Sequence, residues 1–178
     1  MLVRHPSSFV DGIYKEDLMR KDSRGFSLIE LLIVVAIILI IAAIAIPNLL
    51  RSRIAANQAS CVGSLRTINT AEITYASTYN AGYSSTLGQL QPPATGAQPT
   101  STAAGLIDSV LASGAKSGYT FVYTAGAVVN NRIDTYGLNG NPITVGTTGT
   151  NYYFTDQSGV IRQNSTAAAG ASDSPLAG

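Results

Sequence analysis

"RGFSLIELLIVVAIILIIAAIAIPNLL", residues 24–50, is the stretch that decides the fold. It holds the most apolar run of the chain, because all sixteen residues from Leu31 to Ile46 are Leu, Ile, Val or Ala. As an α-helix, the 21 residues from Phe26 to Ile46 would measure about 31 Å, close to the roughly 30 Å of a bilayer's hydrocarbon core. The stretch therefore predicts a helix that can span a membrane.

Glu30 places a single carboxylate at the entrance of this run. The twelve large apolar residues between Leu31 and Ile46 favour insertion by roughly 4 to 7 kcal/mol in total, against a cost of about 3 kcal/mol for one acidic residue at the membrane centre. Insertion is therefore favourable overall despite the carboxylate. Pairing with an opposite charge would lower the free-energy cost of the carboxylate in lipid.

A second helical pattern follows the apolar run. Pro47 is expected to kink or locally open the helix, because proline lacks the amide donor and clashes with the preceding turn. Largely apolar residues then recur at alternating spacings of four and three, which is typical of one buried helical face. They are Ile54, Gln58, Cys61, Leu65, Ile68, Glu72, Tyr75 and Tyr79. We predict one long helix over about 26–79.

Composition excludes several function classes. Charged residues make up 12% of the 178 residues and the net charge is +1, so the chain lacks the excess of basic residues typical of nucleic-acid-binding proteins. The part after Gly25 carries six basic and six acidic residues and is formally neutral. His5 and Cys61 are the only histidine and cysteine, so that part cannot build a Ser-His-Asp, Cys-His or multi-thiolate zinc site. We expect no enzyme activity, catalytic residue, cofactor or metal.

The rest of the chain predicts a small head. Residues 80–103 are rich in Gly, Pro, Ser and Thr and predict a loop, with Tyr83, Leu87 and Leu90 as its anchors. A short helix is expected over about 104–113, before a terminating glycine.

Strand patterns follow the loop. "YTFVYT", residues 119–124, has the period of a strand, and "NYYFTDQSGVIRQN", residues 151–164, predicts a hairpin that turns at 156–159. "GLNGNP" and "GTTGT", residues 137–142 and 146–150, are interpreted as turns.

The segment from Gly25 to Leu50 closely resembles the processing and assembly segment of type IV pilins and type II secretion pseudopilins. A glycine, an aromatic residue, a carboxylate four residues later and a proline after the apolar run all coincide. "NPITVGTTGTNYYFTDQSGVIR", residues 141–162, has a weaker resemblance to the C-terminal hairpin of some bacterial pilins.

The resemblance implies that a prepilin peptidase cuts after Gly25 on the cytoplasmic side and methylates the new amino group of Phe26. It implies that Glu30 pairs with the Phe26 amine of a neighbouring subunit, with Pro47 as the third residue of the assembly segment. The expected partners are the bilayer, the chain itself and other pilins, the prepilin peptidase, and the inner-membrane assembly platform with its ATPase.

These patterns together predict an α+β pilin fold, with a long N-terminal helix packed on a small C-terminal antiparallel sheet. The expected divisions are a leader to be removed, a membrane and filament-core helix, its amphipathic continuation, a loop with a short helix, a sheet, and a flexible tail. They correspond to residues 1–25, 26–46, 47–79, 80–118, 119–163 and 164–178. Met19 is expected as the true start.

The charges on either side of the apolar run only weakly indicate how the helix is oriented in the membrane. Arg20, Lys21 and Arg24 favour a cytoplasmic N-terminus, but Arg51 and Arg53 beyond the apolar run reduce that bias, so the orientation is taken from the resemblance. We expect a single-pass protein of the bacterial inner membrane before assembly and an extracellular pilus after it.

Alternatives remain open at this level. The apolar run would also suit a simple membrane anchor, or a secretory signal cleaved after Ala43-Ile44-Ala45, although Glu30 argues against a signal. A major pseudopilin of a type II secretion system and a non-polymerising membrane-anchored binding protein are the two alternative functions. The pseudopilin gains weight because Cys61 alone cannot make the disulfide that closes the C-terminal region of many type IVa pilins.

Minor motifs are weighed against their ordinary structural roles. Asp108, Asp134 and Asp156 are considered as calcium ligands, with turn capping favoured for Asp156. Asn164 begins a glycosylation sequon, a short match that arises easily by chance. Tyr75, like its neighbour on the same helical face, is interpreted as a core contact.

Overall fold

The computed structural model describes residues 25–176. The expected leader up to residue 24 and the expected start at Met19 lie outside these residues. Helix α1, Leu28–Tyr79, is 52 residues long and continues through Pro47. The predicted long N-terminal helix is therefore confirmed. By its contacts the chain divides into two units, one ending at Ile41 and one from Ala42 onward, and the head belongs to the second.

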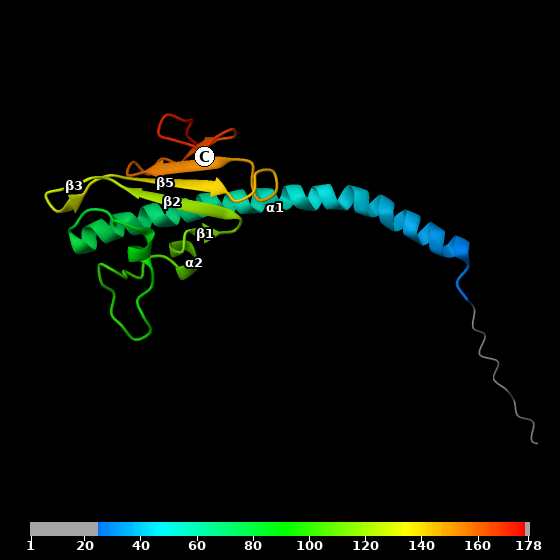
Figure 1. The fold of residues 1–178 in the computed structure, drawn as a ribbon, viewed down its shortest axis with the longest axis horizontal. Helices are drawn as coiled ribbons and strands as arrows, with labels where there is room; N and C mark the ends of the chain where they lie inside the picture. The colour runs from blue at the N-terminus through cyan, green and yellow to red at the C-terminus, as the bar shows by residue number, and fades with distance from the viewer. Residues whose placement is uncertain (1–24, 177–178) are drawn as a thin grey trace, which may run out of the picture. The chain divides into compact units, whose positions relative to one another are not determined.

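Short elements follow α1 in the head. They are η1 (Leu87–Leu90), α2 (Ser109–Ala112), β1 (Ala115–Lys116), β2 (Tyr119–Ala125), β3 (Val128–Val129), β4 (Arg132–Ile133), β5 (Tyr136–Pro142), β6 (Tyr152–Asp156) and β7 (Arg162–Asn164). Five strands form one antiparallel sheet in the order β1-β2-β5-β6-β7, and β3 and β4 form a separate hairpin. Figure 1 shows the strands β2 and β5 running alongside the C-terminal half of α1. The predicted α+β class is confirmed.

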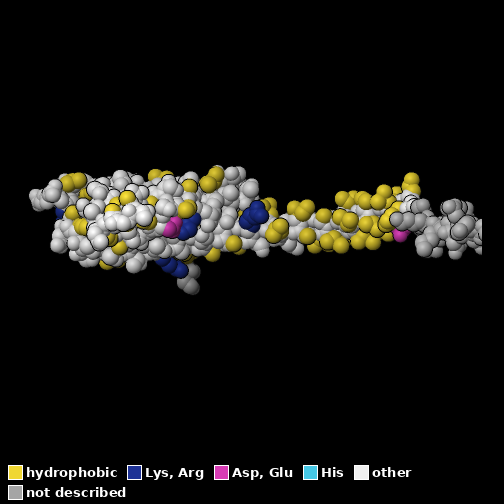
Figure 2. All heavy atoms as spheres, turned by 90° about the horizontal axis from the view of Figure 1, so that it is seen from below, with side chains coloured by type: hydrophobic (Ala, Val, Ile, Leu, Met, Phe, Trp, Pro, Cys, Tyr) yellow, Lys and Arg dark blue, Asp and Glu magenta, His cyan; other side chains and the backbone are white. Residues whose placement is uncertain are grey.

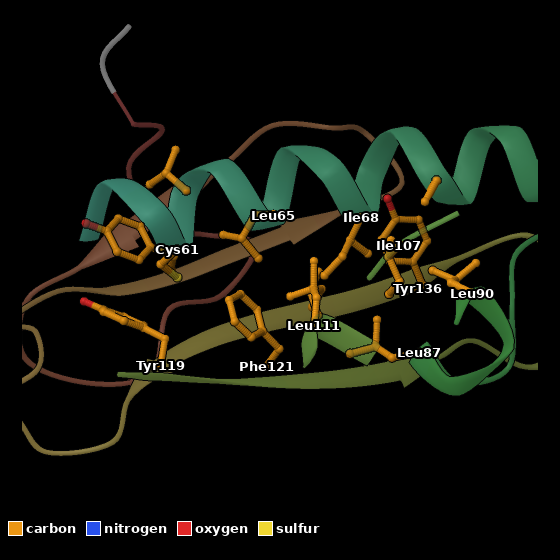
Figure 3. Packing of buried hydrophobic residues seen from close by; sticks show 14 of the residues in the cluster. Cys61, Leu65, Ile68, Leu87, Leu90, Ile107, Leu111, Tyr119, Phe121 and Tyr136 are labelled. Atoms are coloured by element: carbon orange, nitrogen blue, oxygen red, sulfur yellow. The ribbon is translucent and has the colours of Figure 1, made fainter. Parts of the chain in front are cut away.

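The core lies between α1 and the sheet. Cys61, Leu65 and Ile68 are fully buried, and Figure 3 shows them pointing from α1 toward the side where Tyr119 and Phe121 stand on β2. The alternating spacing of four and three therefore identified the buried face of the helix correctly. Burial of such apolar side chains is the main force that holds a sheet on a helix.

The interpretation of residues 137–142 as a turn is wrong. They form β5, which pairs with β2 on one side and β6 on the other and is the central strand of the sheet. Glycine weakens strands in general and proline is poor in a sheet centre, which is why the pattern favoured a turn. Here Gly140 is required by packing, because a β-carbon at that position would lie 2.6 Å from Cys61 Sγ.

The short helix is also shorter than predicted. Residues 104–107 are not helical; instead the amides of Ala104 and Leu106 donate to the carbonyls of Gln89 and Leu90, which tie this segment to η1. Helix α2 begins after Asp108, whose carboxylate accepts the Leu111 amide at 2.9 Å as an N-cap. A local capping side chain, rather than apolar spacing, sets where the helix begins.

The described part of the tail, residues 164–176, is hydrogen-bonded to β7 and within itself. Asp173 organises it, because its carboxylate accepts hydrogen bonds from the Asn164 side chain at 2.9 Å and from the Gly170 amide at 2.8 Å. The Leu176 amide donates to the Ile161 carbonyl at 2.8 Å. These hydrogen bonds hold residues 164–176 against β7, and we call them the Asp173 clasp.

We predict that Gly140→Ala destabilises the head by about 1–3 kcal/mol, the usual cost of an extra methyl in a filled core. The cost should fall in a Cys61→Ala background, because the sulfur that the new methyl would meet is then absent. Urea unfolding of the full chain in detergent micelles, followed by tyrosine circular dichroism, measures both.

Gly63→Ala is the matched control. A β-carbon there meets nothing within 4 Å, and alanine is the better helix former by about 1 kcal/mol. An equal cost of Gly140→Ala in both backgrounds would show that Cys61 is not what requires the glycine.

Candidate assembly site

The assembly segment starts with three residues that precede the helix. Gly25, Phe26 and Ser27 are not helical, and the Ser27 carbonyl accepts the Leu31 amide at 3.1 Å, which begins the helical ladder. Nothing lies within 4 Å of a β-carbon built on Gly25. The Phe26 side chain is 78% exposed. Among residues 25–176, no atom beyond its chain neighbours crowds the Gly25 side of the Gly25–Phe26 bond.

Glu30 lies in the first turn of α1 and is exposed. A carboxylate in this turn interacts favourably with the unpaired amides and the dipole of the helix N-terminus. No ion pair within residues 25–176 involves Glu30. The structure therefore brings Phe26 and Glu30 to the same helix end, while the nitrogen of Phe26 is still in a peptide bond with Gly25.

The helix beyond Glu30 exposes an apolar surface. All residues from Leu31 to Leu50 are exposed except Ala42, which is half-buried. This helix is long and apolar enough to cross a membrane, and none of its most apolar 18-residue window is buried. Figure 2 shows the hydrophobic side chains covering this stretch, with a carboxylate near its start and basic side chains where it ends. The segment has no partner in its own described chain.

Pro47 lies within α1 rather than at its end. Because proline has no amide hydrogen, the carbonyl of Ala43 lacks its usual donor four residues later. The helix nevertheless continues on both sides, so Pro47 locally weakens the backbone ladder without ending it.

The other residues considered from sequence do not form a shared site. Asp108 caps α2 and pairs with Lys116 at 2.8 Å, and Asp156 accepts the Ser158 amide within its turn. Asp134 pairs with Arg132. No group of three or more potential metal ligands occurs within the described residues. The side-chain nitrogen of Asn164, the candidate glycosylation atom, donates to Asp173.

The geometry defines an α+β protein with a small antiparallel head and a helix whose apolar half carries one carboxylate near an exposed glycine. Residues 20–46 match the family model described as the prokaryotic N-terminal methylation motif. The N-terminal segment is thus similar to those of type IV major pilins, so the resemblance seen in this segment of the sequence is confirmed.

Two relatives illustrate the match. The type IV major pilin protein PilA of Myxococcus xanthus is 50% identical over 50 residues, which are 28% of this chain and 23% of that protein. The type IV wide pilus major component PilA4 of Thermus thermophilus is 62% identical over 37 residues, 21% of this chain and 28% of that protein. The chain thus spans about a quarter of the length of these relatives. No solved structure matches.

The head contains a polar cluster whose hydrogen bonds the sequence did not reveal. Glu72 is fully buried on α1, and its two oxygens accept the amide of Ser84 at 2.8 Å and the Ser84 hydroxyl at 2.6 Å. The Tyr123 hydroxyl donates to the Ser84 carbonyl at 2.8 Å. Glu72 therefore ties the loop after α1 to the helix and, through Ser84, to β2.

Tyrosines surround this carboxylate. The rings of Tyr123 and Tyr136 stack with centroids 5.7 Å apart, and Tyr83 meets Tyr136 edge-on at 4.8 Å. The Tyr136 hydroxyl donates to the Asn69 side chain at 2.9 Å, which in turn donates to Thr155. The only sequence signal for the cluster was one carboxylate in an otherwise largely apolar helical face.

Burial raises the pKa of the Glu72 carboxyl above its ordinary value of 4.5, and the hydrogen bonds from Ser84 only partly oppose this shift. Burial likewise raises the pKa of Tyr123 and Tyr136, with a further contribution from the charge of Glu72. Burial also raises the pKa of the Cys61 thiol to about 12, so this cysteine is a buried, unreactive part of the core.

We predict that Glu72→Gln changes the pH dependence of folding. The raised pKa means that the folded state binds the Glu72 proton more tightly than the unfolded state does. The resulting stabilisation is fully present below about pH 4.5 and is lost as the pH rises through the folded-state pKa. A tenfold difference in proton affinity between the two states corresponds to about 1.4 kcal/mol. Urea unfolding at several pH values should show that the free energy of unfolding of Glu72→Gln increases relative to that of the wild type as the pH rises.

Ser84→Ala is the comparison, because it removes the 2.6 Å hydrogen bond but keeps the carboxylate. It should destabilise the head by about 1–3 kcal/mol, the cost of leaving a buried acceptor without its donor. A constant difference between Glu72→Gln and the wild type at every pH would contradict the assignment.

Proposed function

We propose that the chain is a structural subunit of a type IV pilus. In this proposal it enters the bacterial inner membrane as a prepilin with its N-terminus in the cytoplasm, is processed after Gly25, and polymerises into a helical surface filament. The observation that carries the proposal is the apolar surface of α1 between Leu31 and Leu50, which is exposed along its length. Such a surface needs an apolar environment that the chain itself does not provide.

Lipid and copies of the same helix are the two environments that suit this surface. In a bilayer the apolar side chains face hydrocarbon, and in a filament they face the equivalent side chains of neighbouring subunits. Assembly then transfers the helix from one apolar environment to another. The matches to a type IV major pilin and to a wide pilus component support this interpretation.

Processing would complete the assembly site. The exposed and uncluttered Gly25 offers its backbone to a prepilin peptidase, and cleavage creates the amino group of Phe26, which the enzyme methylates. That amine would be the positively charged partner that Glu30 does not find among residues 25–176. In this proposal, each added subunit pairs its amine with a carboxylate already in the filament, which sets the axial register. The assembly platform and its ATPase supply the work of extraction.

We predict that Glu30→Ala leaves membrane insertion intact or slightly improved but lowers filament yield. Removing a carboxylate lowers the cost of insertion in lipid, whereas a filament of variant subunits would bury an unpaired amine at each step. Breaking a buried ion pair costs about 3–5 kcal/mol. Quantitative blotting of membrane and sheared-filament fractions measures the two effects, and mass spectrometry of wild-type filaments should give a chain beginning at methylated Phe26.

Asp134→Ala is the matched control, because it removes an exposed head carboxylate that pairs only with Arg132. It should leave both fractions unchanged. Equal filament yields from Glu30→Ala and the wild type, at normal membrane levels, would show that Glu30 is not the assembly determinant.

A further inference from the structure

Arg51 and Arg53 mark the end of the apolar half of α1. Arg51 is the first charged residue after Glu30 and follows it by 21 positions (51 minus 30), roughly 32 Å along a helix. That length is close to the roughly 30 Å of a hydrocarbon core. When one end of the apolar run lies at one face of a membrane, the two arginines therefore reach the opposite face.

Both arginine side chains are exposed and lack a carboxylate partner among residues 25–176. The ion pairs in this part of the chain join Lys116 to Asp108 and Arg132 to Asp134. Beyond the pair, Ile54 is half-buried and the Asn57 side chain donates to the Thr148 carbonyl at 2.9 Å. Neither guanidinium group is therefore ion-paired within the described residues, and both can meet a partner outside them.

The spacing of Arg51 and Arg53 on α1 indicates what kind of partner can bind both. Two positions along an α-helix differ by about 200° around its axis and by about 3 Å along it. Arg51 and Arg53 therefore leave the helix on nearly opposite sides at nearly the same level. They cannot converge on one carboxylate. A layer of anionic groups that surrounds the helix at one depth can meet both at once.

We propose that Arg51 and Arg53 bind the phosphates of anionic phospholipids on the side of the membrane opposite to Phe26. The inference rests on the proposed membrane insertion of α1. Guanidinium groups bind phosphate oxygens through paired hydrogen bonds, and long basic side chains at helix ends reach the headgroup layer. The contact holds the inserted subunit at a defined depth and is released when the helix is extracted.

The test compares lipid retention by the full chain. Wild type, Arg51→Gln/Arg53→Gln and Arg66→Gln are reconstituted into vesicles of equal phosphatidylglycerol and phosphatidylcholine, and the lipids bound to the released protein are counted by native mass spectrometry. Arg66 is the matched control, because it is an exposed arginine further along the same helix, also outside the ion pairs of the described residues. One basic residue near an anionic surface contributes about fivefold. The wild type and Arg66→Gln should retain phosphatidylglycerol preferentially by at least that factor, and the double variant should retain both lipids about equally.

A double variant that keeps the wild-type preference would overturn the inference, as would a loss of preference in Arg66→Gln of the same size. Vesicle flotation separates this failure from that of the proposed function. A wild-type chain that floats with the vesicles but shows no lipid preference overturns only the headgroup site. A wild-type chain that does not float overturns membrane insertion and the site together. Reduced filament yield of the double variant with unchanged lipid preference would assign the arginines to a neighbouring subunit instead.

Discussion

The apolar half of α1 has no partner in its own described chain, and the other features of the molecule depend on that constraint. A stretch of Leu, Ile and Val this long cannot remain in water, so it must lie in lipid or against other apolar helices. A charged residue lies at each end of this stretch. Glu30 stands at the start and Arg51 at the end. In the proposed filament an amine neutralises Glu30, and in the proposed membrane-inserted state Arg51 lies where the helix leaves the apolar layer.

The same helix serves a second purpose after Ile54. There its sequence becomes amphipathic, and one face buries against the sheet while the other remains polar. The burial of Leu65 and Ile68 under β2 and β5 makes the head a compact unit. Glu72 then fastens the following loop to this helix through Ser84. The apolar segment and the buried face thus belong to one helix, which continues through Pro47.

Features encoded by local periodicity were predictable from the sequence. The long helix, its buried face and the hairpin that turns at Asp156 follow from spacings of three to four residues, from strand alternation and from a glycine with positive φ. Strand β5 was not predictable in this way, because Gly140 is explained only by Cys61, which is 79 positions earlier in the chain (140 minus 61). The hydrogen bonds of Asp173 and those of Glu72 likewise join different segments of the chain, and no local sequence pattern shows which segments meet.

In the proposed filament, the apolar half of α1 becomes buried among copies of itself. The most direct test is the rate at which a water-soluble maleimide labels Ala36→Cys in sheared filaments, compared with filaments dissociated in guanidinium. The exposed head position Ala127→Cys reports on access to intact filaments, and the buried Cys61 provides the background. We predict that the cysteine at position 36 is protected in intact filaments and labelled rapidly after dissociation, while the cysteine at position 127 reacts in both. Equally rapid labelling at position 36 in intact and dissociated filaments would contradict this claim.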